Sequence, residues 1–234
     1  FALFADAQHE QPGFACAPFT ENTRVAWIDG RHVGDGVPAW LPAELVLLGG
    51  VVVGGCSRIG YATSNGTACA PTYGEAVERG LCELLERDAF MIVWANRLSL
   101  PRLDWSQDER IRDLERRYFA ATGLAYAVVD LSVFHELPSF LAVARARPGV
   151  PGALGVGAGT DASVERAWWK ALSEAFAARA AGVKLALLEP GRALGSRGAG
   201  VLSFEDHIRY YEDHSRATGA AFLDTSPARV PVAS

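Results

Sequence analysis

Two glutamates and an arginine on one predicted helix are the residues best suited to chemistry in this sequence. Glu83, Glu86 and Arg87 form a Glu-x-x-Glu-Arg string, and side chains three residues apart on a helix lie together, with about 5–6 Å between their Cβ atoms. Carboxylates this close repel unless a cation or a proton lies between them. Mg²⁺ fits such a pair because it is bound by few carboxylates together with nucleotide phosphates, and Arg87 is placed to pair with Glu83 or to contact phosphate. A solvated helix face with i, i+4 ion pairs explains the same string without any ligand.

The string lies in a long predicted helix that covers residues 76–97. Thr72 and Glu75 have the spacing of a capping box, in which the threonine oxygen and the glutamate side chain satisfy free amides at the helix start. At about 100° per residue, the three carboxylates gather on one side of this helix. The apolar residues of the other side, which we expect to face the core, are Val77, Leu81 and Leu84.

Alternating strands and helices, with a hairpin at the front, predict an α+β (mixed α/β) fold. Further helices are predicted over residues 107–122, 162–182 (capped by Thr160 or Asp161) and 204–217. Strands are predicted over residues 24–28, 37–48, 125–131 and 140–146, with a strand start at 221–223. Residues 51–53 are either a strand or a loop, and the glycines of residues 155–159 predict a turn.

A weak internal repeat relates two of the predicted helices. An offset of 91 residues superposes Leu81 and Leu172, Glu83 and Glu174, and Arg79 and Lys170. The second copy has Ala177 in the place of Glu86. Any two amphipathic helices give matches of this kind, so a true repeat and a chance resemblance both stay open.

Composition and missing motifs exclude several classes of protein. The 22 basic and 27 acidic residues give a formal net charge of −5, which disfavours nucleic-acid binding. The longest apolar stretches, such as residues 45–53, are far shorter than the roughly 18 residues of a membrane span. The four cysteines form no C-x-x-C pair, which argues against a zinc site or a disulfide framework and favours a cytoplasmic protein. Thr160 stands where a dinucleotide fingerprint needs its last glycine, so a Rossmann oxidoreductase is a distant alternative.

The strings around the glutamates carry a family resemblance. They are residues 64–72 (SNGTACAPT), Glu75-Ala76 and residues 80–90 (GLCELLERDAF). They resemble the YcaO family, and within it the azoline-forming cyclodehydratase subunits of thiazole/oxazole-modified peptide biosynthesis. The resemblance extends to Ala171-Leu172-x-Glu174 and Asp206-His207, and it spans most of residues 1–224.

The resemblance implies an ATP- and Mg²⁺-dependent enzyme with a YcaO-like fold, in which β-sheets are combined with long helices that carry the carboxylates of the nucleotide site. In such enzymes a Cys, Ser or Thr side chain of a ribosomal precursor peptide attacks the preceding amide, ATP phosphorylates the oxyanion, and loss of phosphate leaves a thiazoline or oxazoline. The family pattern assigns Mg²⁺ to Glu83, Glu86 and Glu174. It assigns the nucleotide to Ser64, Asn65, Glu75, Arg87 and Arg179. The catalytic residues stay unassigned because the family's C-terminal segment is absent from residues 1–234.

Departures from the family pattern leave alternatives open. Ala70 replaces a glycine of the signature, and Ala177 replaces a glutamine three residues after Glu174. We expect residues 1–234 to be the central portion of a single YcaO domain, without its first nucleotide motif or C-terminal segment, and to bind ATP weakly or not at all in isolation. The implied partners are the precursor peptide, a leader-peptide-binding protein or domain, an optional FMN-dependent dehydrogenase and a second copy in a homodimer, with no nucleic acid and no membrane. A non-catalytic subunit and a sibling chemistry such as thioamide formation are the alternatives.

Overall fold

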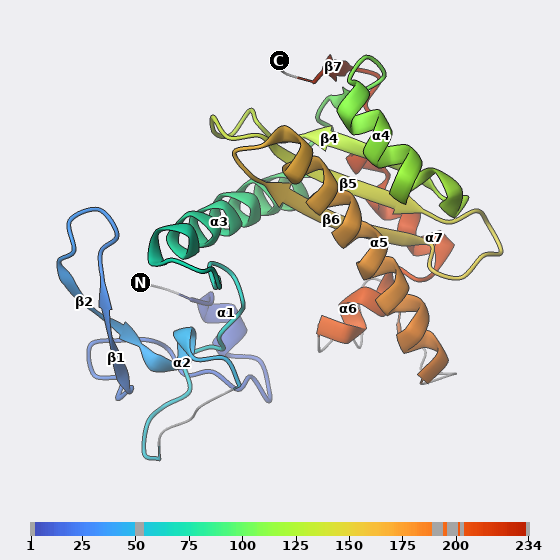
Figure 1. Ribbon diagram of the computed structural model, residues 1–234. Coiled ribbons are helices and arrows are strands. Elements are labelled where there is room, and N and C mark those ends of the chain that lie inside the picture. Colours follow the sequence, from blue (N-terminus) through green and yellow to red (C-terminus); the bar gives the residue numbers. More distant parts are fainter. Residues whose placement is uncertain (1–2, 50–53, 189–193, 196–200, 202–203, 233–234) are drawn as a thin grey trace. The chain divides into compact units, whose positions relative to one another are not determined.

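The structure is a computed structural model that describes residues 3–49, 54–188, 194–195, 201 and 204–232 (Figure 1). The chain divides into two compact units, Phe1–Val77 and Glu78–Ser234. Helices and two sheets occur together, which confirms the predicted α+β class. Residues 51–53, for which the sequence favoured neither strand nor loop, lie outside the described residues.

The first unit contains the predicted front hairpin. Its elements are α1 (Asp6–His9), β1 (Trp27–Arg31), β2 (Pro38–Pro42) and α2 (Ala43–Val46). β1 and β2 pair antiparallel, with Trp27 opposite Pro42. The strand predicted over residues 37–48 therefore ends early, because the chain turns into α2 directly after Pro42.

The second unit is built on a five-stranded sheet with the order β6-β5-β4-β3-β7. The strands are β3 (Arg102–Asp104), β4 (Ala125–Asp130), β5 (Ser139–Arg145), β6 (Leu154–Thr160) and β7 (Arg229–Pro231). β3, β4, β5 and β6 pair antiparallel in sequence order, and β7 pairs parallel to β3. The order leaves β6 at one edge of the sheet.

Helices cover both faces of this sheet. They are α3 (Tyr73–Asn96), α4 (Glu109–Tyr118), α5 (Val164–Leu188), α6 (Phe204–Tyr210) and α7 (His214–Ala217), with the 3₁₀ helices η1 (Ala120–Thr122) and η3 (Thr218–Leu223). One core packs residues of α4 and α5, including Ile111 and Trp168, against the sheet. A second core packs α3, α7 and η3 against the opposite face, with Val93 and Leu223 among its buried residues. Within the described residues, no helix has the length and apolar character needed to cross a membrane.

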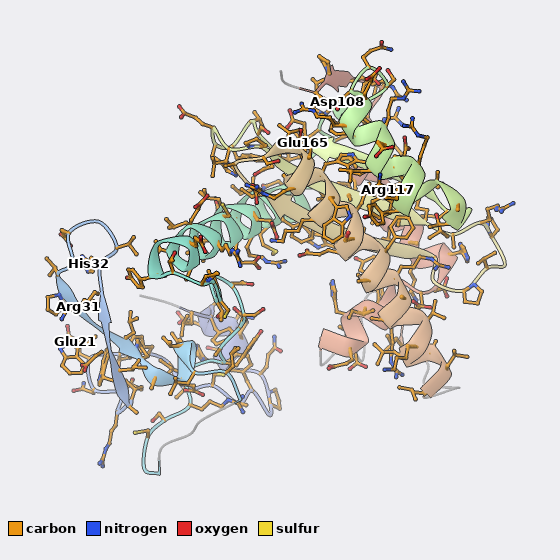
Figure 2. All side chains as sticks on the ribbon, in the orientation of Figure 1. Glu21, Arg31, His32, Asp108, Arg117 and Glu165 are labelled. Atoms are coloured by element: carbon orange, nitrogen blue, oxygen red, sulfur yellow. The ribbon has the colours of Figure 1, made fainter. Side chains whose placement is uncertain are left out.

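Charged contacts join the starts of α4 and α5. Asp108 caps α4 by accepting hydrogen bonds from the amides of Arg110 and Ile111. The Arg110 guanidinium also reaches Glu165 in the first turn of α5, at 2.6 Å, and Figure 2 shows Asp108 and Glu165 close together at these helix starts. The start of α5 is thereby tied to α4. The α5 cap itself is Ser163, whose hydroxyl accepts from the Arg166 amide, and not Thr160 or Asp161 as the sequence suggested.

The glycines of residues 155–159 form a strand, so the predicted turn is wrong. Gly155, Gly157 and Gly159 all face α5, whose backbone lies against them. A Cβ atom added to Gly157 would lie 2.3 Å from the amide nitrogen of Ala175. Side chains would therefore hold α5 away, and the alternating glycines exist because helix and strand are in close contact.

Two more local predictions fail. The predicted helix over residues 204–217 is interrupted after Tyr210, and α7 restarts at His214 with Asp213 as its N-cap. The predicted strand start at residues 221–223 belongs to η3. In both places the chain folds back to cover the sheet, and Ala220 and Leu223 are buried there. Burial against the sheet has overridden the local apolar pattern.

The buried side of α3 also differs from the predicted one. Its buried residues are Gly80, Glu86, Ala89 and Val93. Leu81 and Leu84 are instead 45% and 50% exposed. Small residues let α3 approach the sheet, and a carboxylate occupies the buried side because the protein supplies polar partners for it there.

Candidate functional site

Three of the four glutamates that the sequence grouped surround one lysine ammonium. Nζ of Lys170 lies 2.8 Å from Glu86 Oε2 and 3.1 Å from Glu83 Oε2. It also lies 3.9 Å from Glu174 Oε1, one turn further along α5. The structure therefore brings Glu83 and Glu86 of α3 together with Glu174 of α5, and the Lys170 ammonium lies 2.8–3.9 Å from a carboxylate oxygen of each.

The cluster lies at the free edge of β6, where backbone amides point at it. The Thr160 amide donates to Glu86 Oε2 at 2.8 Å, and the Ala158 amide donates to Glu174 Oε2 at 3.5 Å. These residues are two apart on an edge strand, so their amides point away from β5 in the same direction. The strand edge thus donates to one carboxylate from each helix.

Solvent exposure increases across the cluster. The side chains of Glu86, Glu83 and Glu174 are 1%, 21% and 44% exposed, and that of Lys170 is 35% exposed. Glu86 Oε1 is buried and has no hydrogen-bond partner within the described residues. A ligand would therefore approach from the side of Lys170 and Glu174 and would find an acceptor still unused at the buried end.

Burial and charge shift the pKa values of the cluster together. Burial raises the pKa of Glu86, against the hydrogen bond and charge of Lys170. Burial also raises the pKa of Glu174, helped by the charge of Glu86. Burial by itself would lower the pKa of Lys170, but its hydrogen bond to Glu86 and the surrounding carboxylates raise it. The carboxyl groups of Glu86 and Glu174 thus bind protons more readily than usual and the Lys170 ammonium retains its proton, as expected where carboxylates outnumber positive charges.

Arg87 lies beside the cluster on α3. Its guanidinium is 3.7 Å from Glu83 and 5.6 Å from the centre of the Phe90 ring. Its Nε is buried without a hydrogen-bond partner in the part of the chain that the structure describes. The ion pair is long and the side chain is 39% exposed, and contact of Arg87 with phosphate stays a prediction.

Arg179 has local partners in this structure. Its Nε donates to the Gly152 carbonyl at 2.8 Å, and its Nη2 donates to the Pro151 carbonyl. These bonds fasten the turn before β6 to α5. Its assignment to phosphate stays a prediction.

The remaining predicted residues belong to the first unit. Ser64 and Asn65 form a turn in which the Thr67 amide donates to the Ser64 carbonyl, and Gly66 takes a φ of +76°. Glu75 lies in the first turn of α3, where its amide donates to Thr72 Oγ1 at 3.3 Å. That bond is the threonine half of the predicted capping box. The roles of these three residues stay predictions.

Sequence reasoning did not include Lys170 among the site residues. The residue appeared only as the counterpart of Arg79 in the weak repeat. Its four-residue spacing from Glu174 was a usable signal, because oppositely charged residues at i and i+4 meet on a helix face. Its contacts with Glu83 and Glu86 cross more than 80 residues of sequence, and no local pattern reveals them.

The donor set suits Mg²⁺ only in combination with a nucleotide. Within the described residues, no group of three or more His, Cys, Asp or Glu side chains is arranged to hold a metal ion unaided. Mg²⁺ seldom uses such protein cages and is commonly held by one or two carboxylates together with substrate phosphates and water. Carboxylate oxygens gathered around one cation, with a buried acceptor still free, fit that requirement.

A family model matches residues 1–231, and its description is "YcaO cyclodehydratase, ATP- and Mg²⁺-binding". The chain belongs to the YcaO family. ATP and Mg²⁺ are therefore the cofactors described for its family. The resemblance inferred from the strings around Glu75 and Glu83 is confirmed.

Curated relatives share part of this chain. It is 31% identical over 134 residues to an "uncharacterized protein in tfuA 3'region" of Rhizobium leguminosarum bv. trifolii, covering 55% of this chain and 31% of the relative. It is 29% identical over 161 residues to an uncharacterized protein of Methanothermobacter thermautotrophicus, covering 68% of this chain and 42% of the relative. The chain spans well under half the length of these relatives.

Solved YcaO-type structures share the fold. The heterocyclase TruD matches with a TM-score of 0.63 and 21% identity, over 93% of this chain and 28% of its own. YcaO from Methanopyrus kandleri, bound with AMPPCP and Mg²⁺, matches with a TM-score of 0.51 and 21% identity, over 88% of this chain and 49% of its own. The E. coli microcin synthetase McbBCD complex with pro-MccB17 bound matches with a TM-score of 0.61 and 12% identity, over 89% of this chain and 51% of its own.

Proposed function

We propose that the protein catalyses ATP- and Mg²⁺-dependent cyclodehydration of Cys, Ser or Thr residues in a ribosomal precursor peptide, giving thiazolines or oxazolines. One observation carries the proposal: Glu83, Glu86 and Glu174, which the family signature assigns to Mg²⁺, meet around one cation at the edge of β6. Family membership supports the chemistry.

Glu83, Glu86 and Glu174 would hold Mg²⁺, which when bound neutralises phosphate charge and orients the triphosphate. Lys170 keeps these carboxylates close together, so little reorganisation is needed when a second cation arrives. The amides of Ala158 and Thr160 fix the carboxylates from the strand side. The site is thus organised before the nucleotide binds, which favours electrostatic stabilisation of developing charge.

Residues for the nucleotide itself are proposed from the signature. Arg87, whose side chain is 39% exposed, would contact phosphate, and Arg179 would add a second positive charge. The signature also assigns the nucleotide to Ser64, Asn65 and Glu75. Lys170, at 35% exposure, is placed to neutralise a phosphate oxygen as well.

The proposed reaction converts a poor leaving group into a good one. A side-chain thiol or hydroxyl of the peptide adds to the preceding backbone carbonyl and loses its proton, leaving an oxyanion on the former amide carbon. That oxygen takes the γ-phosphoryl group of ATP, and ADP leaves. The carbon–oxygen bond then breaks, phosphate departs and the amide nitrogen loses its proton, so one water is removed overall for each ring.

The peptide and its carrier are part of the proposal. A precursor peptide needs a site that recognises it outside the reacting residues, which a leader-binding protein or domain would provide. Assembly with such a partner is consistent with the microcin synthetase, which is a complex with pro-MccB17 bound. An FMN-dependent dehydrogenase that oxidises the rings and a homodimeric arrangement are further proposals from the family resemblance.

The test is phosphate release by the full-length protein with and without its precursor peptide, together with the mass of the peptide. We expect phosphate release that depends on peptide, with the loss of one water from the peptide for each phosphate. Peptide-dependent ATP consumption without loss of water would favour the sibling chemistries, such as thioamide formation. No ATP consumption by the complete complex would favour a non-catalytic subunit, to which Ala70 and Ala177 point.

A further inference from the structure

Two buried hydroxyl side chains behind Glu86, and a half-buried histidine next to them, have no part in the proposed chemistry. Ser139 of β5 and Thr160 of β6 lie opposite each other in the sheet and are 0% and 3% exposed. Their hydroxyl oxygens are 2.5 Å apart. Ser139 Oγ also lies 3.2 Å from Nε2 of His135. A chain of hydrogen bonds therefore runs from His135 through Ser139 to Thr160.

This chain ends at the candidate site. Thr160 is the last residue of β6, and its amide donates to Glu86 Oε2 at 2.8 Å. The same carboxylate oxygen accepts from Lys170 at 2.8 Å. The position of the Thr160 amide therefore decides where the Glu86 carboxylate lies relative to the ammonium and to the other carboxylates.

Ser139 is itself well fixed. Its amide donates to Ser132 Oγ at 3.3 Å, and its carbonyl accepts from the Leu131 amide at 2.8 Å. The hydroxyl pair thus ties the end of the edge strand to a strand that is bonded on both sides. Apolar residues would fill the same space without any polar group to satisfy, so packing alone does not account for two hydroxyls here.

We propose that Ser139 and Thr160 are positioning residues for the Mg²⁺–nucleotide site. Their hydroxyl pair, backed by His135, holds the end of β6 so that its amide keeps Glu86 in the orientation that the metal and nucleotide require. The inference rests on the proposed function, in which Glu86 belongs to the site. Groups that orient a metal-binding side chain commonly contribute 10–100-fold in metal affinity, and we expect about tenfold for this pair.

The experiment measures binding separately from activity. Because a ligand that binds only the native state raises Tm, the Tm of the full-length protein is followed with AMPPCP present while Mg²⁺ is titrated. The variants are Ser139→Ala and Thr160→Val, with Thr160→Ser as the conservative variant. The matched control is Ser226→Ala, since Ser226 is also a buried serine of the second unit.

Ser139→Ala and Thr160→Val should each need about tenfold more Mg²⁺ to reach half of the AMPPCP-induced rise in Tm. Thr160→Ser retains a hydroxyl and should stay near the wild-type midpoint, as should Ser226→Ala. In phosphate-release assays, the first two variants should show the same shift in the Mg²⁺ requirement, with kcat recovered at saturating Mg²⁺.

A lower Tm for Ser139→Ala with an unchanged Mg²⁺ midpoint would overturn the proposal, because the pair would then only stabilise the fold. Failure of the proposed function looks different. A wild-type protein that binds Mg²⁺ and AMPPCP but makes no rings would refute cyclodehydration, while the variants would still decide the positioning role. A wild-type protein with no response to Mg²⁺ and AMPPCP would refute both.

Discussion

Replacing Gly157 by alanine should damage both the fold and the site. The added Cβ would lie 2.3 Å from the Ala175 nitrogen, 2.5 Å from the Ala171 oxygen and 2.6 Å from Cβ of Glu174. None of these atoms is the end of a flexible side chain, so the overlap can be removed only if α5 itself moves. An ordinary contact starts at 3.4 Å, and α5 must therefore retreat by about 1 Å.

The magnitude follows from the cost of overpacking. Extra atoms in a packed interior commonly cost about 1–3 kcal/mol. Here we expect the free energy of unfolding to fall by about 2 kcal/mol, which lowers Tm by about 4–8 °C in a protein unit of this size. The retreat also withdraws Glu174 from the Ala158 amide, and Lys170 of the same helix from Glu83 and Glu86 of α3. Gly157→Ala should therefore require more Mg²⁺ for AMPPCP binding, beyond what its lower stability explains.

Differential scanning calorimetry and the Mg²⁺ titration with AMPPCP provide the measurement. Gly219→Ala is the matched control, because a Cβ atom there would meet nothing within 4 Å. The control should keep the wild-type Tm within about 1 °C and the wild-type Mg²⁺ midpoint. If Gly157→Ala behaves like the control, the close contact between β6 and α5 does not exist as described.

Three further predictions concern other parts of the second unit. Glu83→Gln should lower peptide-dependent phosphate release by roughly two to three decades, as loss of a preorganised charged group does, with a Tm near that of the wild type; near-normal ring formation would show that Glu83 is not a metal ligand. Asp224→Ala should lower the free energy of unfolding in urea by about 2–3 kcal/mol, because it leaves the partly buried Arg145 without the carboxylate that lies 2.7 Å away, and an unchanged urea midpoint would contradict this. Burial against Trp94 lowers the pKa of His207, so the unfolded chain binds more protons and stability should fall as the pH drops through about 6.5. His207→Phe should flatten that part of the urea-midpoint profile, and a parallel profile would refute the assignment.

The long helices could be predicted because their signals are local. The Thr72 cap and the helical spacing beyond it identified α3, and residues 125–131 and 140–146 identified β4 and β5 within one residue. The glycine strand could not be identified in this way. Alternating glycines are typical of turns, and their actual reason, the α5 backbone at 2.3 Å from a Cβ on Gly157, exists only in the folded protein.

The site was partly predictable because some of its residues belong to recognisable local strings. Glu83, Glu86 and Glu174 were found because they belong to a specific signature. The side of α3 that is buried was predicted wrongly, since a hydrophobic pattern cannot reveal that Glu86 is buried while Leu84 is exposed. Burial of Glu86 depends on the Thr160 amide and on Lys170, and both come from distant segments.

The separation of these partners in sequence has a consequence for how the protein matures. Glu86 is 74 residues from Thr160 and 84 from Lys170, so a growing chain contains α3 long before these two partners of Glu86 have been synthesised. Until β4, β5 and β6 have paired and α5 has been synthesised, the Glu86 carboxylate on the buried side of α3 lacks the Thr160 amide and the Lys170 ammonium that stabilise its charge. Docking of α3 should therefore be a late step, completed together with α5. Nucleotide and metal would bind only chains that have finished this step, and their binding would stabilise the completed protein against reopening.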